Sequence, residues 1–248
     1  MTILEAHGLC RRYGSRTQGV DALRDVSLSL ARGEILGIVG ESGSGKSTLL
    51  KLLSGLEPPD RGEILLFGRT LSPKRTKEDY RAIQMIFQDA VGSFHPRRII
   101  ADSIRESVRS LCGRGEEPDK AALSAQVGLT PELMDRYPRE LSGGQCQRFA
   151  IARAVAVSPS ILLCDEITSA LDVSSQAQIL RLLRDICRSR DMSALFVSHD
   201  LAVVSCLCDR VLVMRDGAVV EEGETRRMIA EPGTAYTREL MDSVLEFR

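Results

Sequence analysis

Eight residues, GESGSGKS at positions 40–47, constrain the fold more than any other part of the chain. They match the pattern G-x-x-x-x-G-K-[ST], in which a glycine-rich turn lets backbone N–H groups point at a phosphate. Lys46 is placed to reach the β- and γ-phosphates, and Ser47 to hold Mg²⁺. An apolar run at 34–39 precedes the loop and a helical pattern at 46–53 follows it, as the mechanism requires. The pattern predicts nucleotide binding, and a flexible Gly/Ser turn is the alternative.

The composition sets broad limits on partners and location. The chain has 248 residues with 33 basic and 34 acidic side chains, and this balance argues against a general binder of nucleic acid. Tryptophan is absent and aromatic residues make up 4% of the chain, which leaves few platforms for stacking on bases. The sequence contains no uninterrupted stretch of about 18 apolar residues, so no membrane span is predicted. The first residues do not resemble a signal peptide. The seven cysteines are odd in number and scattered, which predicts reduced cytosolic thiols.

Apolar runs alternate with helical patterns along most of the chain, which predicts an α/β fold with a largely parallel sheet. Strands are expected at 3–9, 27–30, 34–39, 63–67, 84–87, 161–164 and 194–197. Asp216 and Gly217 separate two further short strands and predict a hairpin turn. Strand patterns are missing from 89 to 157, where an inserted helical subdomain is expected, with a charged loop at 113–120 between two helices. The tail, 224–247, is also expected to be helical.

A second motif stands at 161–166, where an apolar strand ends in two carboxylates. An acidic strand terminus at the protein surface is the simplest interpretation of a lone aspartate. Together with the glycine-rich loop, however, Asp165 is better interpreted as the partner of Mg²⁺. Glu166 is then placed to polarise the attacking water. The adjacent glutamate narrows the class to nucleotide hydrolases that keep a base on the same strand.

A third motif opens an alanine-rich helix. Ser142 and Gln145 form an S-x-x-Q capping box, so a capped helix start is the simplest interpretation. Gly143 and Gly144 weaken the first turn but open the helix N-terminus to an anion, which indicates a second phosphate site. Because the helical insert separates this site from the loop at 40–47, one nucleotide is not expected to use both within one chain. A head-to-tail dimer would bring the two together.

In combination, these motifs resemble those of the ATP-binding subunits of ABC transporters, over nearly the whole chain. The segment 141–145, LSGGQ, is similar to the signature of that family. The resemblance implies that Gln88 senses Mg²⁺ and the membrane partner, that Asp172 crosses a dimer interface, and that His199 contacts the γ-phosphate. Tyr13 is similar to the aromatic residue that stacks on adenine.

The resemblance implies ATP and Mg²⁺ as cofactors and divides the site residues by role. The catalytic set would be Glu166, His199 and Gln88, and the metal set Ser47, Gln88 and Asp165. The nucleotide would be bound by Tyr13, Gly40, Glu41, Ser42, Gly43, Ser44, Gly45, Lys46, Ser47, Thr48, Ser142, Gly143, Gly144, Gln145 and Asp172. The implied fold is a P-loop NTPase core with an antiparallel β subdomain and the helical insert, so that residues 1–248 form one ATP-binding domain.

One segment indicates the kind of transporter. The residues 87–97, FQDAVGSFHPR, are similar to those of dipeptide, oligopeptide and nickel importers, with His95 in place of the usual asparagine. Ile167 stands where the family usually has proline, and Cys146 replaces a common glutamine, but neither change removes a group that the chemistry needs. The chain stops at Arg248 without the cysteine-rich tail of oligopeptide-type subunits, which favours a nickel or metal–chelator importer over a peptide importer.

An importer implies a second ATP-binding subunit, identical or paralogous, two membrane permeases and, indirectly, a substrate-binding protein. Its place would be the cytoplasmic face of the inner membrane, without a nucleic-acid partner. Phe94 is expected to line a groove that receives a short permease helix. Two alternatives stay open: the ATPase of a soluble enzyme complex such as carbon–phosphorus lyase, and an ATPase of DNA repair or the ribosome. The lack of a coiled-coil insert or a basic run counts against the second.

Overall fold

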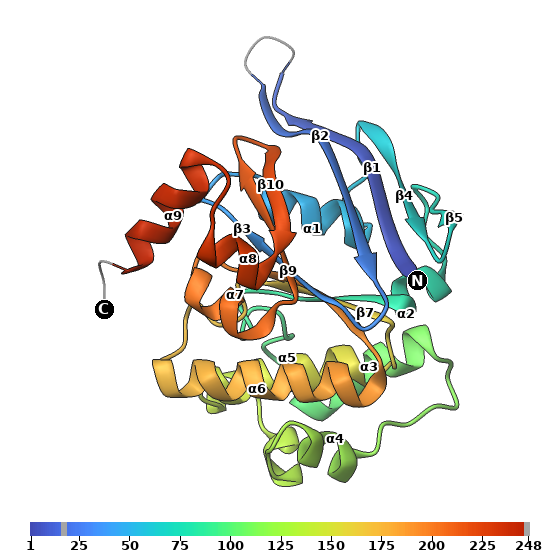
Figure 1. Cartoon of the computed structure of the whole chain (residues 1–248). Helices are drawn as coiled ribbons and strands as arrows, with labels where there is room; N and C mark the ends of the chain where they lie inside the picture. Colours follow the sequence, from blue (N-terminus) through green and yellow to red (C-terminus); the bar gives the residue numbers. More distant parts are fainter. Residues whose placement is uncertain (16–18, 246–248) are drawn as a thin grey trace.

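The computed structural model describes residues 1–15 and 19–245, and its strands form two sheets (Figure 1). The smaller sheet contains β1 (Thr2–Tyr13), β2 (Val20–Ala31), β4 (Arg61–Leu66) and β5 (Arg69–Thr70). The larger contains β3 (Ile35–Val39), β6 (Ile83–Ile86), β7 (Ile161–Asp165), β8 (Ser193–Val197), β9 (Arg210–Arg215) and β10 (Ala218–Glu224). Over the described residues, the strand orders are β2-β1-β4-β5 and β10-β9-β3-β8-β7-β6. The smaller sheet is antiparallel, and the larger is parallel except for the β9–β10 hairpin.

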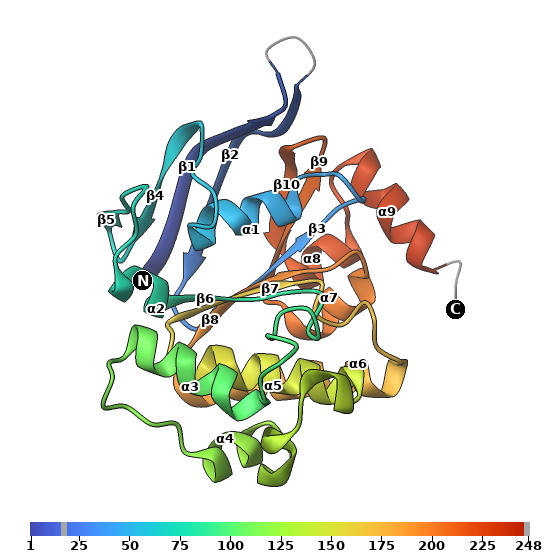
Figure 2. The same cartoon turned by 180° about the vertical axis from the view of Figure 1, so that it is seen from behind.

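The larger sheet is buried on both faces, which explains why its central strands are continuous apolar runs. Side chains of β3 alternate between two cores: Leu36 and Ile38 face one, and Ile35 and Val39 the other. The first core also contains the inner face of the smaller sheet and the helix α1 (Lys46–Ser54). Figure 2 shows α1 lying between the two sheets.

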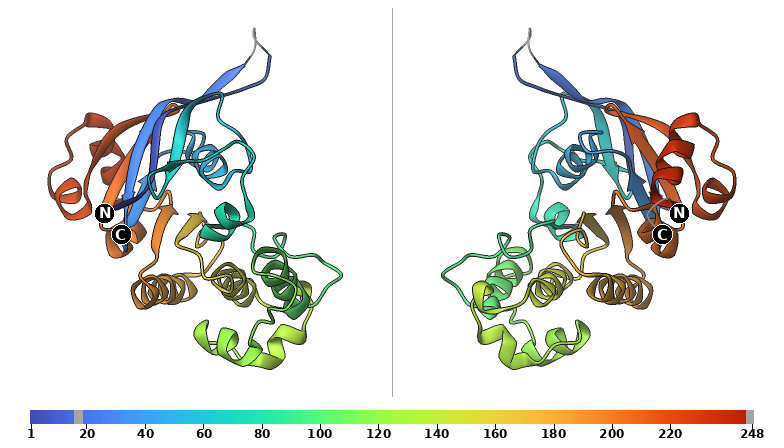
Figure 3. Two further views of the ribbon diagram at one scale, coloured as in Figure 1. Left: turned by 90° about the vertical axis from the view of Figure 1, so that its right-hand side faces the viewer. Right: turned by 90° about the vertical axis from the view of Figure 1, so that its left-hand side faces the viewer.

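Helices cover the other face of the larger sheet. They are α3 (Ile100–Leu111), α5 (Gly143–Val155), α6 (Val173–Arg190) and α7 (Leu201–Leu207). Figure 3 shows α3, α5 and α6 end-on beneath the sheet, with α4 (Lys120–Gln126) below them. One face of α6 packs into this core, because Ile179, Leu183 and Ile186 are buried there.

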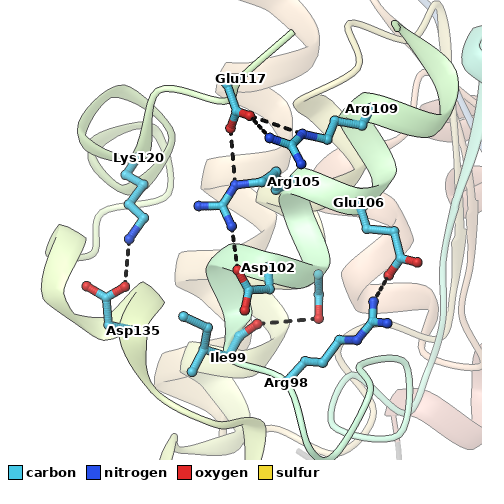
Figure 4. A network of polar contacts seen from close by, with 10 residues as sticks. Arg98, Ile99, Asp102, Arg105, Glu106, Arg109, Glu117, Lys120 and Asp135 are labelled. Atoms are coloured by element: carbon cyan, nitrogen blue, oxygen red, sulfur yellow. Dashed lines mark hydrogen bonds and ion pairs between the residues drawn. The ribbon is translucent and has the colours of Figure 1, made fainter. Parts of the chain in front are cut away.

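Between β6 and β7 the described chain is helical, with two 3₁₀ turns, η1 (Pro131–Asp135) and η2 (Pro138–Glu140), in addition to α3, α4 and α5. The loop before α4 is tied to α3, because Arg105 and Arg109 both contact the carboxylate of Glu117 (Figure 4). Hydrogen bonds from Arg109 lower the pKa of Glu117. Lys120 lies 2.6 Å from Asp135 and closes the same segment onto η1.

The predicted fold class is confirmed, with differences at the level of elements. The strands β1 and β2 extend beyond the predicted runs, and neither β5 nor the helices α2 (Lys77–Ala82) and α7 were expected. The predicted hairpin turn is confirmed, with φ of 49° at Asp216 and 78° at Gly217. The tail forms two helices, α8 (Thr225–Ala230) and α9 (Ala235–Leu245), since Pro232 interrupts it. The last predicted helical positions, 246 and 247, lie outside the described residues.

The cysteines form no bridges within the described part of the chain. Four of them are buried, namely Cys146, Cys164, Cys187 and Cys208, while Cys206 is exposed. No group of three or more His, Cys, Asp or Glu side chains among the described residues is arranged to hold a metal ion. None of the described helices combines the length and the apolar character that a bilayer crossing requires.

The expectation that Phe94 lines an open groove is wrong. Its side chain is 3% exposed and belongs to the core formed with α3 and α5. The guanidinium of Arg153 lies 4.4 Å from the ring centroid and also donates to the backbone oxygen of Ser93 at 2.6 Å. The aromatic ring is therefore covered by the helical segment itself. The sequence does not indicate this burial, because Val91, three residues earlier, is exposed.

Replacing Phe94 with alanine is expected to destabilise the fold by about 3–5 kcal/mol, because a buried ring and its contact with Arg153 are lost together. Urea unfolding followed by circular dichroism measures the change. Val91→Ala, at a position that is 42% exposed, is the control and is expected to change stability by less than ~0.5 kcal/mol. Equal stability of the two variants would contradict the buried position of Phe94.

Candidate nucleotide-binding and hydrolysis site

The glycine-rich loop connects the carboxyl end of β3 to α1 and cannot accept side chains at two of its glycines. A Cβ on Gly40 would lie 2.2 Å from the backbone oxygen of Met214, and one on Gly45 would lie 2.4 Å from that of Ala22. Gly40, Gly43 and Gly45 all have positive φ. This conformation lets the loop turn sharply into the first helical turn, where backbone N–H groups have no partner within the helix.

Two polar side chains of the loop, Lys46 and Ser44, are buried. Lys46 is 5% exposed, and its ammonium donates to the backbone oxygens of Gly40 and Glu41, both at 2.8 Å. Burial lowers the pKa of Lys46, against the opposing charges of Glu166 and Asp165. Ser44 is 4% exposed, and its hydroxyl has no hydrogen-bond partner. The loop therefore holds a buried cation and an unpaired donor, both of which suit a phosphate group.

The carboxyl end of β7 lies beside the start of α1. The hydroxyl of Ser47 is 3.0 Å from a carboxylate oxygen of Asp165, although 118 residues separate them in sequence. Burial raises the pKa of Asp165, while the hydrogen bond from Ser47 opposes this shift. Hydroxyl and carboxylate oxygens are ligands that Mg²⁺ prefers in proteins, so this pair fits the predicted metal position.

Glu166 lies beside the two other side chains that the family resemblance assigned to the catalytic set. Its backbone has a left-handed φ of 46°, which is uncommon outside glycine and turns the side chain away from the strand. The amide nitrogen of Gln88 lies 3.4 Å from the Glu166 carboxylate and 3.2 Å from the hydroxyl of Ser169. Nδ1 of His199 lies 3.6 Å from the same carboxylate. Gln88, Glu166 and His199 thus meet in one place, with Ser169 as an additional member.

The signature segment forms the capped start of α5. The hydroxyl of Ser142 accepts from the N–H of Gln145 at 3.2 Å, and the Gln145 side chain accepts from the N–H of Ser142 at 2.9 Å. A Cβ on Gly143 would meet nothing within 4 Å, so this helix end is open. Within the described residues, no hydrogen bond or ion pair joins Ser142 or Gln145 to the glycine-rich loop. Asp172 caps α6 by accepting from the N–H of Ser175 at 3.0 Å.

The remaining predicted residues lie in or after the loop, except Tyr13, which lies on β1. Ser42 and Ser47 are exposed, and Thr48 lies half-buried in the first turn of α1. Tyr13 stands at the end of β1, where its hydroxyl donates to Glu57 at 2.6 Å and the Arg11 guanidinium lies 5.1 Å from its ring centroid. Tyr13 is 36% exposed.

Sequence reasoning missed one residue that supports the loop. The N–H of Glu41 donates to the hydroxyl of Tyr236 in α9 at 3.2 Å, and Arg215 lies 4.6 Å from the centroid of that ring. Nothing in the pattern of the C-terminal tail indicates this contact, because it exists only once α9 packs beside the loop. Tyr236 therefore positions Glu41 at the mouth of the site.

The geometry agrees with the comparisons to known proteins. A model of the family described as "ABC transporter" matches residues 23–169, which is more than half of the chain. The chain belongs to the ABC transporter family. It is an ATP-binding protein of that family and an ATPase.

Curated relatives and solved structures are consistent with membership of this family. "Oligopeptide transport ATP-binding protein OppF" of Haemophilus influenzae is 44% identical over 94% of this chain and 72% of its own. The Escherichia coli protein of the same name is 45% identical over 90% and 69%. A dimeric cassette structure, MJ0796 in a post-hydrolysis state bound to ADP and Pi, has a TM-score of 0.80 at 27% identity, covering 90% of this chain and 99% of that one. The cbiO1 structure of Clostridium perfringens, described as part of the transporter complex cbiONQ, also has a TM-score of 0.80, at 26% identity, covering 93% of this chain and 91% of that one.

The raised pKa of Asp165 predicts how the stability of the nucleotide-free protein changes with pH. The folded state favours the neutral carboxyl of Asp165. The free energy of folding that this preference contributes is therefore fully present below the ordinary aspartate pKa of about 3.9. It is lost as the pH rises through the raised pKa of Asp165 in the folded protein. At pH 7, Asp165→Asn is therefore expected to raise the Tm, by no more than ~2–4 °C because solvent screens part of the effect.

Thermal unfolding between pH 4 and pH 8 measures this shift, which should shrink toward pH 4. Asp172→Asn is the control with the opposite sign, because hydrogen bonds from Ser175 lower the pKa of Asp172. A lower Tm for Asp165→Asn at pH 7 would contradict the assignment of a destabilising buried charge.

Proposed function

We propose that this chain is the ATP-hydrolysing subunit of an importer, in which residues 1–248 form one ATP-binding domain with a helical insert at about 89–157. The observation that carries the proposal is the 3.0 Å contact between Ser47 and Asp165, with Glu166 held next to it by Gln88 and His199. A phosphate-binding loop, a metal position and a candidate base meet at one edge of the sheet, which is the arrangement that phosphoryl transfer to water requires.

In this proposal each residue has a defined task. Lys46, already desolvated, pairs with the β- and γ-phosphates, and the open N–H groups of the loop bind their oxygens. Glu166 accepts a hydrogen bond from the attacking water and orients it toward the γ-phosphorus. His199 and Gln88 hold the Glu166 carboxylate in place and lie close enough to report whether the γ-phosphate is present.

The donor set fits Mg²⁺. Ser47 and Asp165 supply oxygens at one position, and the amide of Gln88 directs its nitrogen to Glu166, which leaves its carbonyl oxygen for a cation. When bound, Mg²⁺ neutralises the charge that develops on the phosphate oxygens. Tyr13 and Thr48 are proposed to contact the nucleoside and the phosphates, respectively.

We also propose that the working form is a head-to-tail dimer. The open, capped helix end at Ser142–Gln145 is an anion site without a contact to the loop of its own chain, so the loop of a second chain would complete it. Asp172, at the exposed start of α6, lies at the same face as Gly144, since a Cβ there would be 3.8 Å from the Ser175 hydroxyl. Closure of the dimer on ATP would move two permease subunits at the cytoplasmic face of the inner membrane.

The proposed substrate class is small peptides, because the reported relatives are named as oligopeptide transport proteins. Nickel or a metal–chelator complex, favoured by sequence reasoning alone, stays a prediction without such support. Uptake of a labelled tripeptide and of Ni²⁺ by the chain reconstituted with its permeases distinguishes the two. A soluble enzyme complex is the remaining alternative, and association with a permease rather than with soluble enzymes decides against it.

Replacement of Glu166 by glutamine tests the hydrolysis mechanism. Glu166→Gln keeps the size of the side chain but removes the base, so turnover is expected to fall by at least ~100-fold while ATP·Mg²⁺ still binds. Phosphate release and nucleotide binding are measured in parallel. Asp185→Asn, on the exposed face of α6, is a charge-matched control that should hydrolyse ATP normally. Near-normal turnover in Glu166→Gln would exclude this residue as the base.

A mixture of two defective chains tests the composite site. Lys46→Ala damages the loop half, and Ser142→Arg blocks the signature half, so each variant alone forms two damaged sites. A mixed dimer contains one site with both halves intact, and ATP-dependent dimers are therefore expected only in the mixture, measured by size-exclusion chromatography with light scattering. Strong ATP-dependent dimers of Ser142→Arg alone would contradict the head-to-tail arrangement.

A further inference from the structure

A second cavity lies at the opposite edge of the larger sheet from the nucleotide site. It has a volume of about 600 Å³ and is bordered by the ends of α6 and α7, the start of β9 and the start of α8. Glu34, directly before β3, and Arg210, at the start of β9, both line it. Because β3 and β9 are parallel, this cavity is at their amino ends, whereas the glycine-rich loop is at the carboxyl end of β3. The five residues of β3 separate the two sites by roughly 16 Å.

Three cationic side chains of this cavity form no ion pair with any described residue. Arg184 and Arg188 are four residues apart on α6 and so share one face of that helix, while Arg226 comes from α8. Within the described residues, none of the three guanidinium groups has a hydrogen bond or an ion pair. This contrasts with Arg210 in the same wall, which lies 2.8 Å from Glu34 and 3.1 Å from Glu222.

Two of the three carboxylates that line this cavity already accept hydrogen bonds from other groups of the protein. Glu34 is paired with Arg210 and also accepts from the N–H of Ala31 at 2.6 Å. Asp209 accepts from the N–H of Ile35 at 2.9 Å. Glu224 is the remaining carboxylate of the wall, so the open cations outnumber the open anions.

A buried hydroxyl in the same wall is also unpartnered. Thr225 is 2% exposed, and its Oγ1 has no hydrogen-bond partner. Buried hydroxyl groups in folded proteins are nearly always bonded, because an unpaired one costs free energy. A ligand oxygen or a water held at this wall would supply the missing partner. This observation is independent of the arginines and concerns the same wall of the cavity.

We propose that this cavity is a binding site for a small phosphate-bearing molecule, distinct from the ATP site. Guanidinium groups are planar donors that match phosphate oxygens, and arginines from two helices, three in all, line this cavity. The volume falls within the range of small-molecule pockets, about 300–1,000 Å³, and exceeds what a single phosphate needs. Free phosphate and the phosphate group of an organic ester share this chemistry. Since α6 begins at Asp172 and the cavity contacts its last turns, an occupant would bind the same rigid helix that borders the proposed dimer face.

Cys206 provides a local readout, because it lines the cavity and is exposed. The rate of its alkylation by uncharged iodoacetamide is measured by mass spectrometry, with Cys10 and Cys112, outside the cavity, as internal references. Inorganic phosphate and AMP are the probes, and citrate is the carboxylate comparison. Phosphate or AMP is expected to slow Cys206 alkylation about threefold or more once its concentration is twice its Kd, and to leave the references unchanged. Protection by AMP alone identifies an organic ester, and protection by both identifies the phosphate group itself.

Two double variants assign the effect to the cavity. Arg188→Ala/Arg226→Ala removes one exposed arginine from each of α6 and α8 and is expected to abolish protection. Arg181→Ala/Arg227→Ala removes the same charge from the same two helices outside the cavity wall and is expected to keep it. Lys46→Ala, which disables the glycine-rich loop, should also keep it, so this test does not depend on the proposed ATPase mechanism.

The proposal is overturned by any of four results. They are no protection of Cys206 by either probe in the wild-type protein, full protection in Arg188→Ala/Arg226→Ala, equal loss of protection in Arg181→Ala/Arg227→Ala, and equal protection by citrate. The lack of protection by either probe is measured on the wild-type protein, so this result remains decisive if a variant fails to fold.

Discussion

The parallel pairing of β3, β7 and β8 is the constraint on which the rest of the structure depends. It brings the carboxyl ends of three strands to one edge, so that Ser47 and Asp165, 118 residues apart, lie within hydrogen-bond distance. The same pairing places His199, two residues beyond β8, beside Glu166, one residue beyond β7. A shift of register along any of these strands would separate the hydroxyl, the carboxylates and the imidazole together.

The helical segment between β6 and β7 separates the proposed phosphate site at the start of α5 from the glycine-rich loop of the same chain. It carries the signature on the first turn of α5, beneath the sheet, while the loop is above it at the end of β3 (Figure 3). The arginine–carboxylate contacts around Glu117 and the burial of Phe94 under Arg153 tie this segment to itself and to the core. Because the segment is packed as a unit, the signature cannot reach the loop of its own chain by a local rearrangement, and a second chain is the simpler source.

The sequence predicted the local backbone features of the candidate site better than the contacts that surround it. The glycine-rich loop, Asp165 and the capping box at Ser142 are local patterns, in which residue type and spacing already determine the backbone conformation. Tyr236 supports the loop from the far end of the chain, and its contact depends on the packing of α9, which no local pattern encodes. Phe94 was misplaced for a related reason, since an aromatic residue in a charged segment is equally compatible with an open groove and with a covered core.

The nucleotide site is also the place where the fold accepts unfavourable interactions. Lys46 is buried with a lowered pKa, Asp165 is half-buried with a raised one, and Glu166 adopts a left-handed backbone conformation. The hydroxyl of Ser44 is buried without a partner. Phosphates would pair with Lys46 and Ser44, and a cation would neutralise Asp165, so that three of these unfavourable interactions would be relieved when a nucleotide and its metal ion bind. Binding of the phosphates and the cation would thereby stabilise the arrangement of these side chains at the carboxyl edge of the sheet, and the proposed second chain would contribute its signature segment at the same edge.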